Sequence, residues 1–257
     1  MTIIEVREVS KRFTSKKGES EALAGVSLAV REGEFVCLLG PSGCGKTTLL
    51  NLMAGYDRPT AGGILIDGQA VTSPHPKRIT IFQEYALLPW LTVLGNVQYG
   101  LRIQGWRRRE TLETAQKYIQ MVGLEGYEDR HPHELSGGMR QRVAVARALA
   151  VEPEILFMDE PFGALDALTR LKLEEEVTRI WQEKARTVVF VTHDIDEAIY
   201  LADRIAVMTP NPGRVRRVLT VPLNRPRDRT DLDFLRLKRE IYAEFELAAR
   251  PAFHYTI

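Results

Sequence analysis

The sequence predicts an α/β fold with a mainly parallel sheet, and three observations support this prediction. Short apolar runs rich in β-branched residues alternate with stretches of helical periodicity. Several runs are almost continuously apolar, which is typical of strands buried on both faces of a parallel sheet. A glycine-rich loop joins one of these strands to the next helix. The expected strands are residues 3–6, 35–39, 64–66, 79–82, 155–158, 188–192 and 205–208, and the expected helices are residues 46–54, 109–122, 138–150, 169–183 and 194–202.

Two regions depart from this alternation. Residues 1–35 and 60–72 contain short strand candidates joined by turns that carry glycine, at Lys17-Gly18 and Asp67-Gly68. This pattern favours an antiparallel patch attached to the main sheet. The segment of about residues 90–150 is mostly helical in character, and its first part lacks strong strand runs, so we expect a helical subdomain there.

The C-terminal part of the chain has a composition of its own. Residues 210–230 are rich in proline and arginine, which predicts an irregular connector. Apolar residues then recur at roughly helical spacing over residues 231–250. We therefore expect one domain over residues 1–230, with the helical subdomain inside it, and a C-terminal helical extension over residues 231–257.

The overall composition is that of an ordinary globular protein, with 44% hydrophobic and 27% charged residues. A net charge of +1 argues against a wide basic surface, so no nucleic-acid partner is expected, although a local basic patch stays open. Cys37 and Cys44 lack metal-ligand spacing and are expected to be reduced thiols. The chain shows neither the apolar core of a signal peptide nor a window of roughly 20 apolar residues. We therefore expect a cytoplasmic protein that reaches any membrane through a partner.

The glycine-rich loop after residues 35–39 fits the phosphate-loop pattern G-x-x-x-x-G-K-[ST] in full. Its glycines let backbone N–H groups turn toward phosphate oxygens, and the helix after it contributes the positive end of its dipole. Lys46 is expected to reach the β- and γ-phosphates of a nucleotide, and the Thr47 hydroxyl to bind Mg²⁺. The predicted phosphate-binding residues are Gly40, Pro41, Ser42, Gly43, Cys44, Gly45, Lys46, Thr47 and Thr48.

Two carboxylates directly follow the apolar run 155–158. Asp159 and Glu160 are thus predicted at the carboxyl end of a buried strand, where open α/β sheets bind their ligands. Asp159 suits the coordination of Mg²⁺, and Glu160 suits the polarisation of the attacking water as a general base. Acidic residues also end strands as plain turn residues, and it is the complete phosphate loop that favours the functional interpretation.

A third motif, Leu-Ser-Gly-Gly-Met-Arg-Gln at residues 135–141, precedes an expected helix. Ser136 suits an N-cap, and the two glycines after it permit a close approach of the backbone. Together with the phosphate loop and the acid pair, this segment resembles the signature sequence of ATP-binding cassette proteins. The resemblance extends over nearly the whole chain, with the motifs in the family's order. It implies the ATPase cassette fold, which is a phosphate-loop NTPase core with an antiparallel β patch and a helical subdomain.

The resemblance also implies roles for residues whose local sequence is uninformative. Phe13 matches the aromatic residue that stacks on adenine, and Gln83 matches the glutamine that links the nucleotide site to the helical subdomain. His193 matches the histidine that contacts the γ-phosphate. The implied nucleotide-binding residues outside the phosphate loop are Phe13, Ser136, Gly137, Gly138, Gln141 and Asp166. The implied catalytic residues are Lys46, Gln83, Glu160 and His193, and the implied Mg²⁺ ligands are Thr47, Gln83 and Asp159.

Partners follow from the same resemblance. In the family, two cassettes pair head to tail around ATP, which implies a homodimer. A transmembrane permease and a solute-binding protein are the other implied partners, with the chain peripheral on the cytoplasmic side of the inner membrane. Residues 84–97 are expected to dock the permease, with a plain core segment as the alternative. Residues 88–90, 212–214 and 226–229 resemble importers of nitrate, sulfonate and taurine, which implies a small oxyanion as cargo.

Other functions stay open beside that of an ATP-hydrolysing importer subunit. A soluble cassette ATPase acting on DNA usually carries a long coiled-coil insertion, and no sustained heptad run is present. A ribosome-associated factor normally carries two cassettes, whereas this sequence has one set of motifs. A non-hydrolysing interaction module is disfavoured by the intact Lys46, Asp159, Glu160 and His193. The sequence therefore favours the importer subunit.

Overall fold

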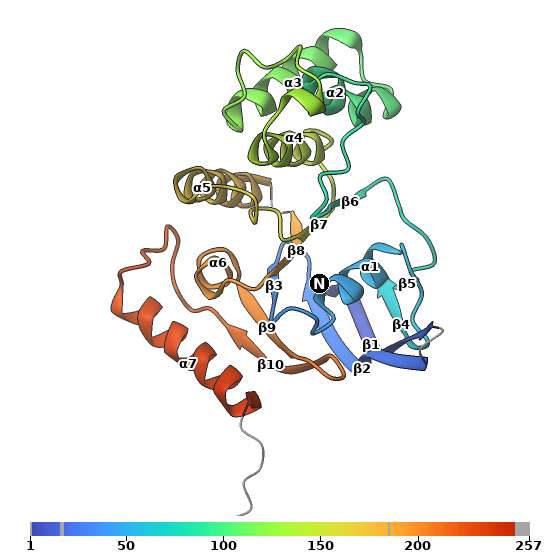
Figure 1. Ribbon diagram of the computed structural model, residues 1–257, viewed down its shortest axis with the longest axis vertical. Coiled ribbons are helices and arrows are strands. Elements are labelled where there is room, and N and C mark those ends of the chain that lie inside the picture. Colours follow the sequence, from blue (N-terminus) through green and yellow to red (C-terminus); the bar gives the residue numbers. More distant parts are fainter. Residues whose placement is uncertain (1, 16–17, 185, 250–257) are drawn as a thin grey trace, which may run out of the picture. The chain divides into compact units, whose positions relative to one another are not determined.

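The computed structural model describes residues 2–15, 18–184 and 186–249, which belong to two compact units (Figure 1). The first unit combines residues 1–74 with 189–257, and the second spans residues 75–188. Lys17 of the expected Lys17-Gly18 turn lies outside the described residues, as do residues 250–257 of the expected C-terminal extension.

An antiparallel sheet forms the N-terminal part of the first unit. Its strands lie in the order β2-β1-β4-β5. They are β1 (Thr2–Ser15), β2 (Gly18–Arg31), β4 (Ala61–Ile66) and β5 (Gln69–Ala70). Val26, Leu28 and Val30 of β2 are buried and alternate with exposed residues, as a sheet with one covered face requires. The expected antiparallel patch is confirmed, with longer strands than the sequence predicted.

A second group of strands in the first unit carries the parallel pattern. Four strands follow one another in the order β10-β9-β3-β8, namely β10 (Arg214–Thr220), β9 (Arg204–Thr209), β3 (Phe35–Leu39) and β8 (Thr187–Thr192). β3 and β9 run parallel, whereas β9 and β10 run antiparallel. Every residue of β3 and β8 is buried, as their continuous apolar sequences predicted. The helices of this unit are α1 (Lys46–Ala54), α6 (Ile195–Leu201) and α7 (Leu232–Ala249).

The prediction of an irregular connector over residues 210–230 was wrong in part, because β10 lies within it. Its sequence, RVRRVLT, has three arginines and therefore lacks the apolar run by which the other strands were recognised. In the strand, Leu219 is buried while the arginines remain exposed. Exposed cations are common on edge strands, since they discourage pairing with another chain.

The second unit is mainly helical. Two parallel strands, β6 (Arg78–Ile81) and β7 (Ile155–Asp159), pair within it. The helical elements are α2 (Val93–Ile103), α3 (Arg108–Met121), the 3₁₀ turn η1 (Pro132–Glu134), α4 (Gly137–Ala150) and α5 (Ala167–Lys184). The absence of strands from residues 90–150 holds for this described stretch, as predicted.

Helix α2 was not among the individual helices expected, although its region was expected to be mostly helical, and residues 84–97 were expected to dock a partner or to form a core segment. The helix begins after Thr92, whose hydroxyl accepts a hydrogen bond from Gly95 N at 3.1 Å. Val93 and Val97 are 1% and 0% exposed and belong to the core. Trp90, just before the helix, is 70% exposed. The docking interpretation is therefore corrected to the part of the segment that precedes α2.

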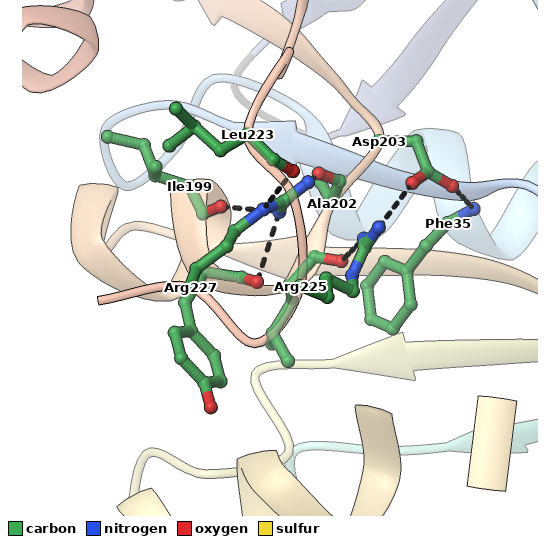
Figure 2. Close-up of polar contacts among 9 residues, drawn as sticks. Phe35, Ile199, Ala202, Asp203, Leu223, Arg225 and Arg227 are labelled. Atoms are coloured by element: carbon green, nitrogen blue, oxygen red, sulfur yellow. Dashed lines mark hydrogen bonds and ion pairs between the residues drawn. The ribbon is translucent and has the colours of Figure 1, made fainter. Parts of the chain in front are cut away.

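Two arginines fasten the segment between β10 and α7 to the C-terminal end of α6 (Figure 2). Arg227 is buried and donates through Nη1 to the carbonyl oxygens of Ile199, Tyr200 and Ala202, at 2.6, 3.0 and 2.7 Å. Arg225 donates to Asp203 Oδ1 at 2.8 Å. These contacts satisfy carbonyl groups that a helix end leaves without an intrahelical partner. We call Arg225, Arg227 and Asp203 the arginine clasp.

None of the helices that the structure describes has the length and apolar character of a membrane span. Cys37 and Cys44 are free and buried, as the sequence predicted. Burial raises the pKa of both thiols, which keeps them protonated at neutral pH.

Candidate functional site

The phosphate loop joins β3 to α1 in the first unit. Gly43 and Gly45 adopt φ values of 80° and 91°, in the left-handed region that other residues reach only with strain. A methyl group on Gly45 would lie 2.6 Å from Leu23 Cδ2, so the loop presses directly against β2. Around Gly43, by contrast, no atom lies within 4 Å of that position. The loop is thus fixed on its inner side and open on its outer side.

The loop's polar groups are arranged for an anion. α1 begins after Gly45 without a side-chain cap, and the N-terminus of a helix attracts anions. Lys46 is 5% exposed, and its Nζ donates to the carbonyls of Gly40 and Pro41 at 2.8 and 3.1 Å. Because an ammonium carries three N–H donors, a phosphate oxygen can be added to these contacts. The loop is therefore suited to an anion, and its binding of phosphate remains a prediction.

His193 stands at the end of β8, beside the same loop. His193, Gly40 and Pro41 line one pocket of about 660 Å³, together with residues of α6, β9 and α7. The turn that carries His193 is fixed by its neighbours. Asp194 Oδ1 caps α6 by accepting from Asp196 N and Glu197 N at 2.8 and 3.2 Å, and Thr192 Oγ1 donates to Glu197 at 2.7 Å. The structure thus brings His193 to the phosphate loop, which spacing alone did not establish.

Phe13 lies on β1 in the first unit and is 44% exposed. Lys11 Nζ lies 4.9 Å from the centroid of its ring and also donates to Asp57 Oδ1 at 2.7 Å. A large aromatic side chain that is nearly half exposed is free to stack on a planar ligand. The position is suited to the expected adenine contact, which remains a prediction.

The acid pair ends β7 in the second unit. Asp159 is 4% exposed, whereas Glu160 is partly accessible and adopts a φ of 46°. A non-glycine residue in this left-handed region is strained by roughly 1–2 kcal/mol. Backbone strain of this kind concentrates at functional sites, where it directs a side chain.

The signature residues form the start of α4. Ser136 caps the helix by accepting from Met139 N at 3.2 Å. Asp166 likewise caps α5, accepting from Thr169 N at 3.0 Å, and the hydrogen bonds from Thr169 lower the pKa of Asp166. Gly137 and Gly138 belong to the first turn of α4. The expected N-cap at Ser136 is thus confirmed, and the contact of these residues with a nucleotide remains a prediction.

Gln141 was expected to bind nucleotide, and the structure shows how its side chain is used within the chain. It is 2% exposed. Its Nε2 donates to the carbonyl of Glu160 at 3.2 Å, and its Oε1 accepts from Ala164 N at 3.1 Å. Both ends of the amide therefore hold the loop that follows the acid pair. The sequence analysis did not foresee this contact.

Gln83 lies in the second unit, just after β6, and is exposed. The segment that follows it is held by α4, because Arg147 donates to the carbonyls of Ala86 and Tyr85 at 2.8 and 3.4 Å. Burial lowers the pKa of Arg147. Sequence reasoning missed Arg147 and Tyr85, since neither falls in a recognised motif.

The donors expected for Mg²⁺ fit that ion chemically. Thr47, Gln83 and Asp159 offer hydroxyl, amide and carboxylate oxygens, which a hard cation prefers. Among the described residues, no group of three or more His, Cys, Asp and Glu is placed to enclose a metal. Mg²⁺ commonly keeps several waters and takes substrate phosphates as ligands instead of an all-protein cage.

Known proteins are similar to this chain over most of its length. The ABC transporter family model matches residues 23–163. The chain is 47% identical to a bicarbonate transport ATP-binding protein of Synechocystis sp., covering 87% of this chain and 80% of the relative. It is 44% identical to an aliphatic sulfonates import ATP-binding protein of Bacillus thuringiensis subsp. konkukian, covering 95% and 96%. A nitrate import ATP-binding protein of Synechocystis sp. is 44% identical, with 92% and 89% covered.

A solved structure shares the fold. It is the dimeric, post-hydrolysis state of an ATP-binding cassette bound to ADP and Pi, with a TM-score of 0.79 and 34% identity. The match covers 86% of this chain and 100% of the solved one. The predicted fold class is thereby confirmed.

Proposed function

The chain belongs to the ABC transporter family, and from that premise we propose that it is the ATPase subunit of an importer for a small oxyanion. The observation that carries the proposal is the complete phosphate loop with Lys46 held at its centre, in a chain whose relatives are import ATP-binding proteins. The relatives named for bicarbonate, sulfonates and nitrate share an anionic cargo rich in oxygen. Oxyanion import is therefore the function that these similarities support best.

In the proposed reaction, water attacks the γ-phosphorus of ATP in line with the leaving oxygen. Lys46 and the N–H groups of the phosphate loop stabilise the charge on the phosphate oxygens. Glu160 accepts the proton of the attacking water, and His193 and Gln83 contact the γ-phosphate and position the water. Mg²⁺, held by Thr47, Gln83 and Asp159, would neutralise charge on the β- and γ-phosphates.

The finer partners are part of the same proposal. A second copy of the chain would supply Ser136, Gly137 and Gly138 to the nucleotide of the first, as the dimeric form of the solved relative supports. A permease would carry the cargo and a solute-binding protein would select it, with this chain peripheral on the cytoplasmic side of the inner membrane. Trp90, which is 70% exposed, would contact the permease.

The Glu160→Gln variant tests the hydrolytic role of this residue. Removing the general base is expected to lower kcat by at least about 100-fold, while ATP binding is retained and the ATP-bound dimer accumulates. Steady-state phosphate release and light scattering with ATP measure the two effects. The matched control is Glu154→Gln, since Glu154 is an exposed carboxylate just before the same strand. Wild-type turnover in Glu160→Gln would remove Glu160 from the reaction.

The cargo needs a separate experiment. The tagged chain is purified from mildly solubilised native membranes, and the co-purifying permease is reconstituted with it in liposomes. ATP-dependent uptake of nitrate, an alkanesulfonate and bicarbonate is then measured, with sugars and amino acids as controls. Uptake confined to oxyanions supports the proposal. Uptake of a non-anionic solute, or recovery with DNA or ribosomes instead of a permease, contradicts it.

A further inference from the structure

Helix α4 contacts two loops of its own chain through different faces. The first loop follows Glu160. Gln141 holds it at the carbonyl of Glu160 and the N–H of Ala164. A methyl group on Gly138 would lie only 3.3 Å from the carbonyl oxygen of Ala164 and 3.4 Å from Leu165 Cδ2. Residues 138 and 141 lie on adjacent turns of one face, and this face is closely packed on the loop of residues 160–165.

The second loop follows Gln83 and lies along another face of α4. Arg147 holds the carbonyls of Tyr85 and Ala86. The guanidinium of Arg140 lies 5.3 Å from the centroid of the Tyr85 ring. A methyl group on Gly137 would lie 3.1 Å from the Tyr85 hydroxyl. Positions 140 and 147 fall on the same side of the helix, because seven residues complete nearly two turns.

In each loop, one hydrogen bond from α4 ends on a strained residue. Ala86 has a φ of 47° and Glu160 a φ of 46°, both in the left-handed region. Arg147 donates to the carbonyl of the first, and Gln141 donates to the carbonyl of the second. Such a conformation costs about 1–2 kcal/mol and persists only where the surroundings hold it. The two side chains of α4 thus stabilise two backbone conformations that the chain would otherwise leave.

We propose that α4 is a rigid link within one chain that sets the conformation of the Gln83 loop and the Glu160 loop together. Arg147 and Gln141 are its positioning residues. Gln141 directs Glu160 by fixing the backbone that carries it, and Arg147 directs Gln83 by fixing the segment two residues after it. The inference rests on the proposed function, because it assumes that Gln83 and Glu160 act in ATP hydrolysis.

The far end of the Gln83 loop is fixed as well. Asn96 of α2 is fully buried, and its side chain accepts from Leu88 N at 2.9 Å and donates to Leu88 O at 3.1 Å. Residues 85–88 are therefore held by α4 at one end and α2 at the other, with the exposed Trp90 just beyond. A force on this segment is transmitted to α4 through Arg147, and from α4 to Glu160 through Gln141.

Two variants of Gln141 test the positioning of Glu160. Gln141→Met keeps the length and loses both hydrogen bonds, and we expect kcat to fall at least about 10-fold with the KM for ATP within about 2-fold of wild type. Gln141→Glu keeps an acceptor for Ala164 N, but its carboxylate cannot donate to Glu160 O. It is expected to be as slow as Gln141→Met. Full activity of Gln141→Met, which keeps neither hydrogen bond, would reduce the role of Gln141 to packing and overturn the proposal.

Hydrogen–deuterium exchange of the purified full chain tests the link itself. In Arg147→Lys, a single ammonium replaces a fork that reaches two carbonyls, so exchange of residues 85–88 is expected to rise at least about 5-fold. If α4 is a link, exchange of residues 160–165 rises too, by about 2-fold. A rise confined to residues 85–88 would show that the two loops are held independently and would overturn the link.

Arg142 provides the matched control on the same helix. Its Nη1 also donates to two carbonyls, those of Val122 and Gly123 at 2.9 and 3.0 Å, which belong to neither loop. Arg142→Lys is expected to raise exchange only near residues 120–124 and to leave kcat within about 2-fold. An equal loss of kcat in Arg142→Lys and Arg147→Lys would contradict the proposal. If the wild-type chain fails to hydrolyse ATP, the proposed function fails, and exchange alone still decides whether α4 links the loops.

Discussion

The two units of the molecule each use an arginine that binds backbone carbonyls, but the two arginines serve different purposes. In the first unit, Arg227 caps the last turn of α6, and the carbonyls it binds belong to a regular helix. In the second unit, Arg147 extends from a regular helix to the loop of residues 85–86, where Ala86 is strained. The first arrangement completes an element that the sequence already favours. The second maintains a conformation that the sequence disfavours.

The comparison distinguishes a contact that mainly adds stability from one that mainly positions a functional segment. Capping a helix end lowers the free energy of the folded chain and leaves the helix geometry unchanged. Holding a strained loop uses folding energy to keep a segment in one position. Loss of Arg227 should therefore mainly lower the free energy of unfolding, and loss of Arg147 should mainly lower kcat.

The largest stability effect is expected for Arg227→Met. Burial lowers the pKa of Arg227 to about 10, yet the group remains charged at neutral pH, and its loss removes the donor from two carbonyls of α6 and from that of the C-cap residue Ala202. Because an unsatisfied buried carbonyl costs about 1–3 kcal/mol and water compensates in part, we expect a loss of about 3 kcal/mol. Urea unfolding at pH 7 measures it.

Arg229→Met is the control for Arg227→Met. Arg229 lies in the same segment, with its guanidinium 3.9 Å from the centroid of the Tyr200 ring. Loss of this cation–π contact is expected to cost about 0.5–1 kcal/mol. Equal losses of stability in the two variants would show that the carbonyl contacts of Arg227 add no more than one cation–π contact. The helix cap would then no longer be the main role of Arg227.

A smaller effect is expected for Asp203→Asn, which changes the carboxylate of the arginine clasp. Asp203 accepts from Arg225 through Oδ1 at 2.8 Å and from Phe35 N through Oδ2 at 2.9 Å. An amide keeps one acceptor oxygen and turns an NH₂ group toward the other donor, so we expect a loss of about 1.5 kcal/mol. Faster hydrogen exchange at the Phe35 amide would locate the loss. An unchanged exchange rate at the Phe35 amide would show that the arginine clasp does not stabilise β3.

Much of the fold was predictable because its signals are local. The phosphate loop, the buried runs of β3 and β8, and the end of β7 are each encoded within a few neighbouring residues. α2 was missed because its signal is partly polar. Asn96 is a buried amide whose partners are backbone groups of residues 88–92, and a polar residue at a core position interrupts an apolar pattern.

The site residues that belong to sequence motifs were predictable. The contacts of Arg147 and Gln141 were not, since their partners lie 61 and 19 positions away in the chain. A guanidinium on a helix is usually solvated, and no spacing rule indicates that this one binds a distant strained loop. Residues that act by holding other residues are therefore found only from the folded structure.

The smallest effect is expected at an exposed ion pair of the first unit, which neither caps an element nor holds a strained loop. Glu244 of α7 accepts from Arg217 at 2.7 Å and from Arg216 at 3.1 Å, and the hydrogen bond from Arg217 lowers the pKa of Glu244. A lowered pKa stabilises the fold above the unfolded value of about 4.3, and this contribution is lost as the pH falls through the folded value. Glu244→Gln should therefore cost less than about 1 kcal/mol at pH 7 and still less at a pH well below the unfolded value. Urea unfolding at both pH values measures this, and a loss that is the same at both would mean that packing, and not charge, joins α7 to β10.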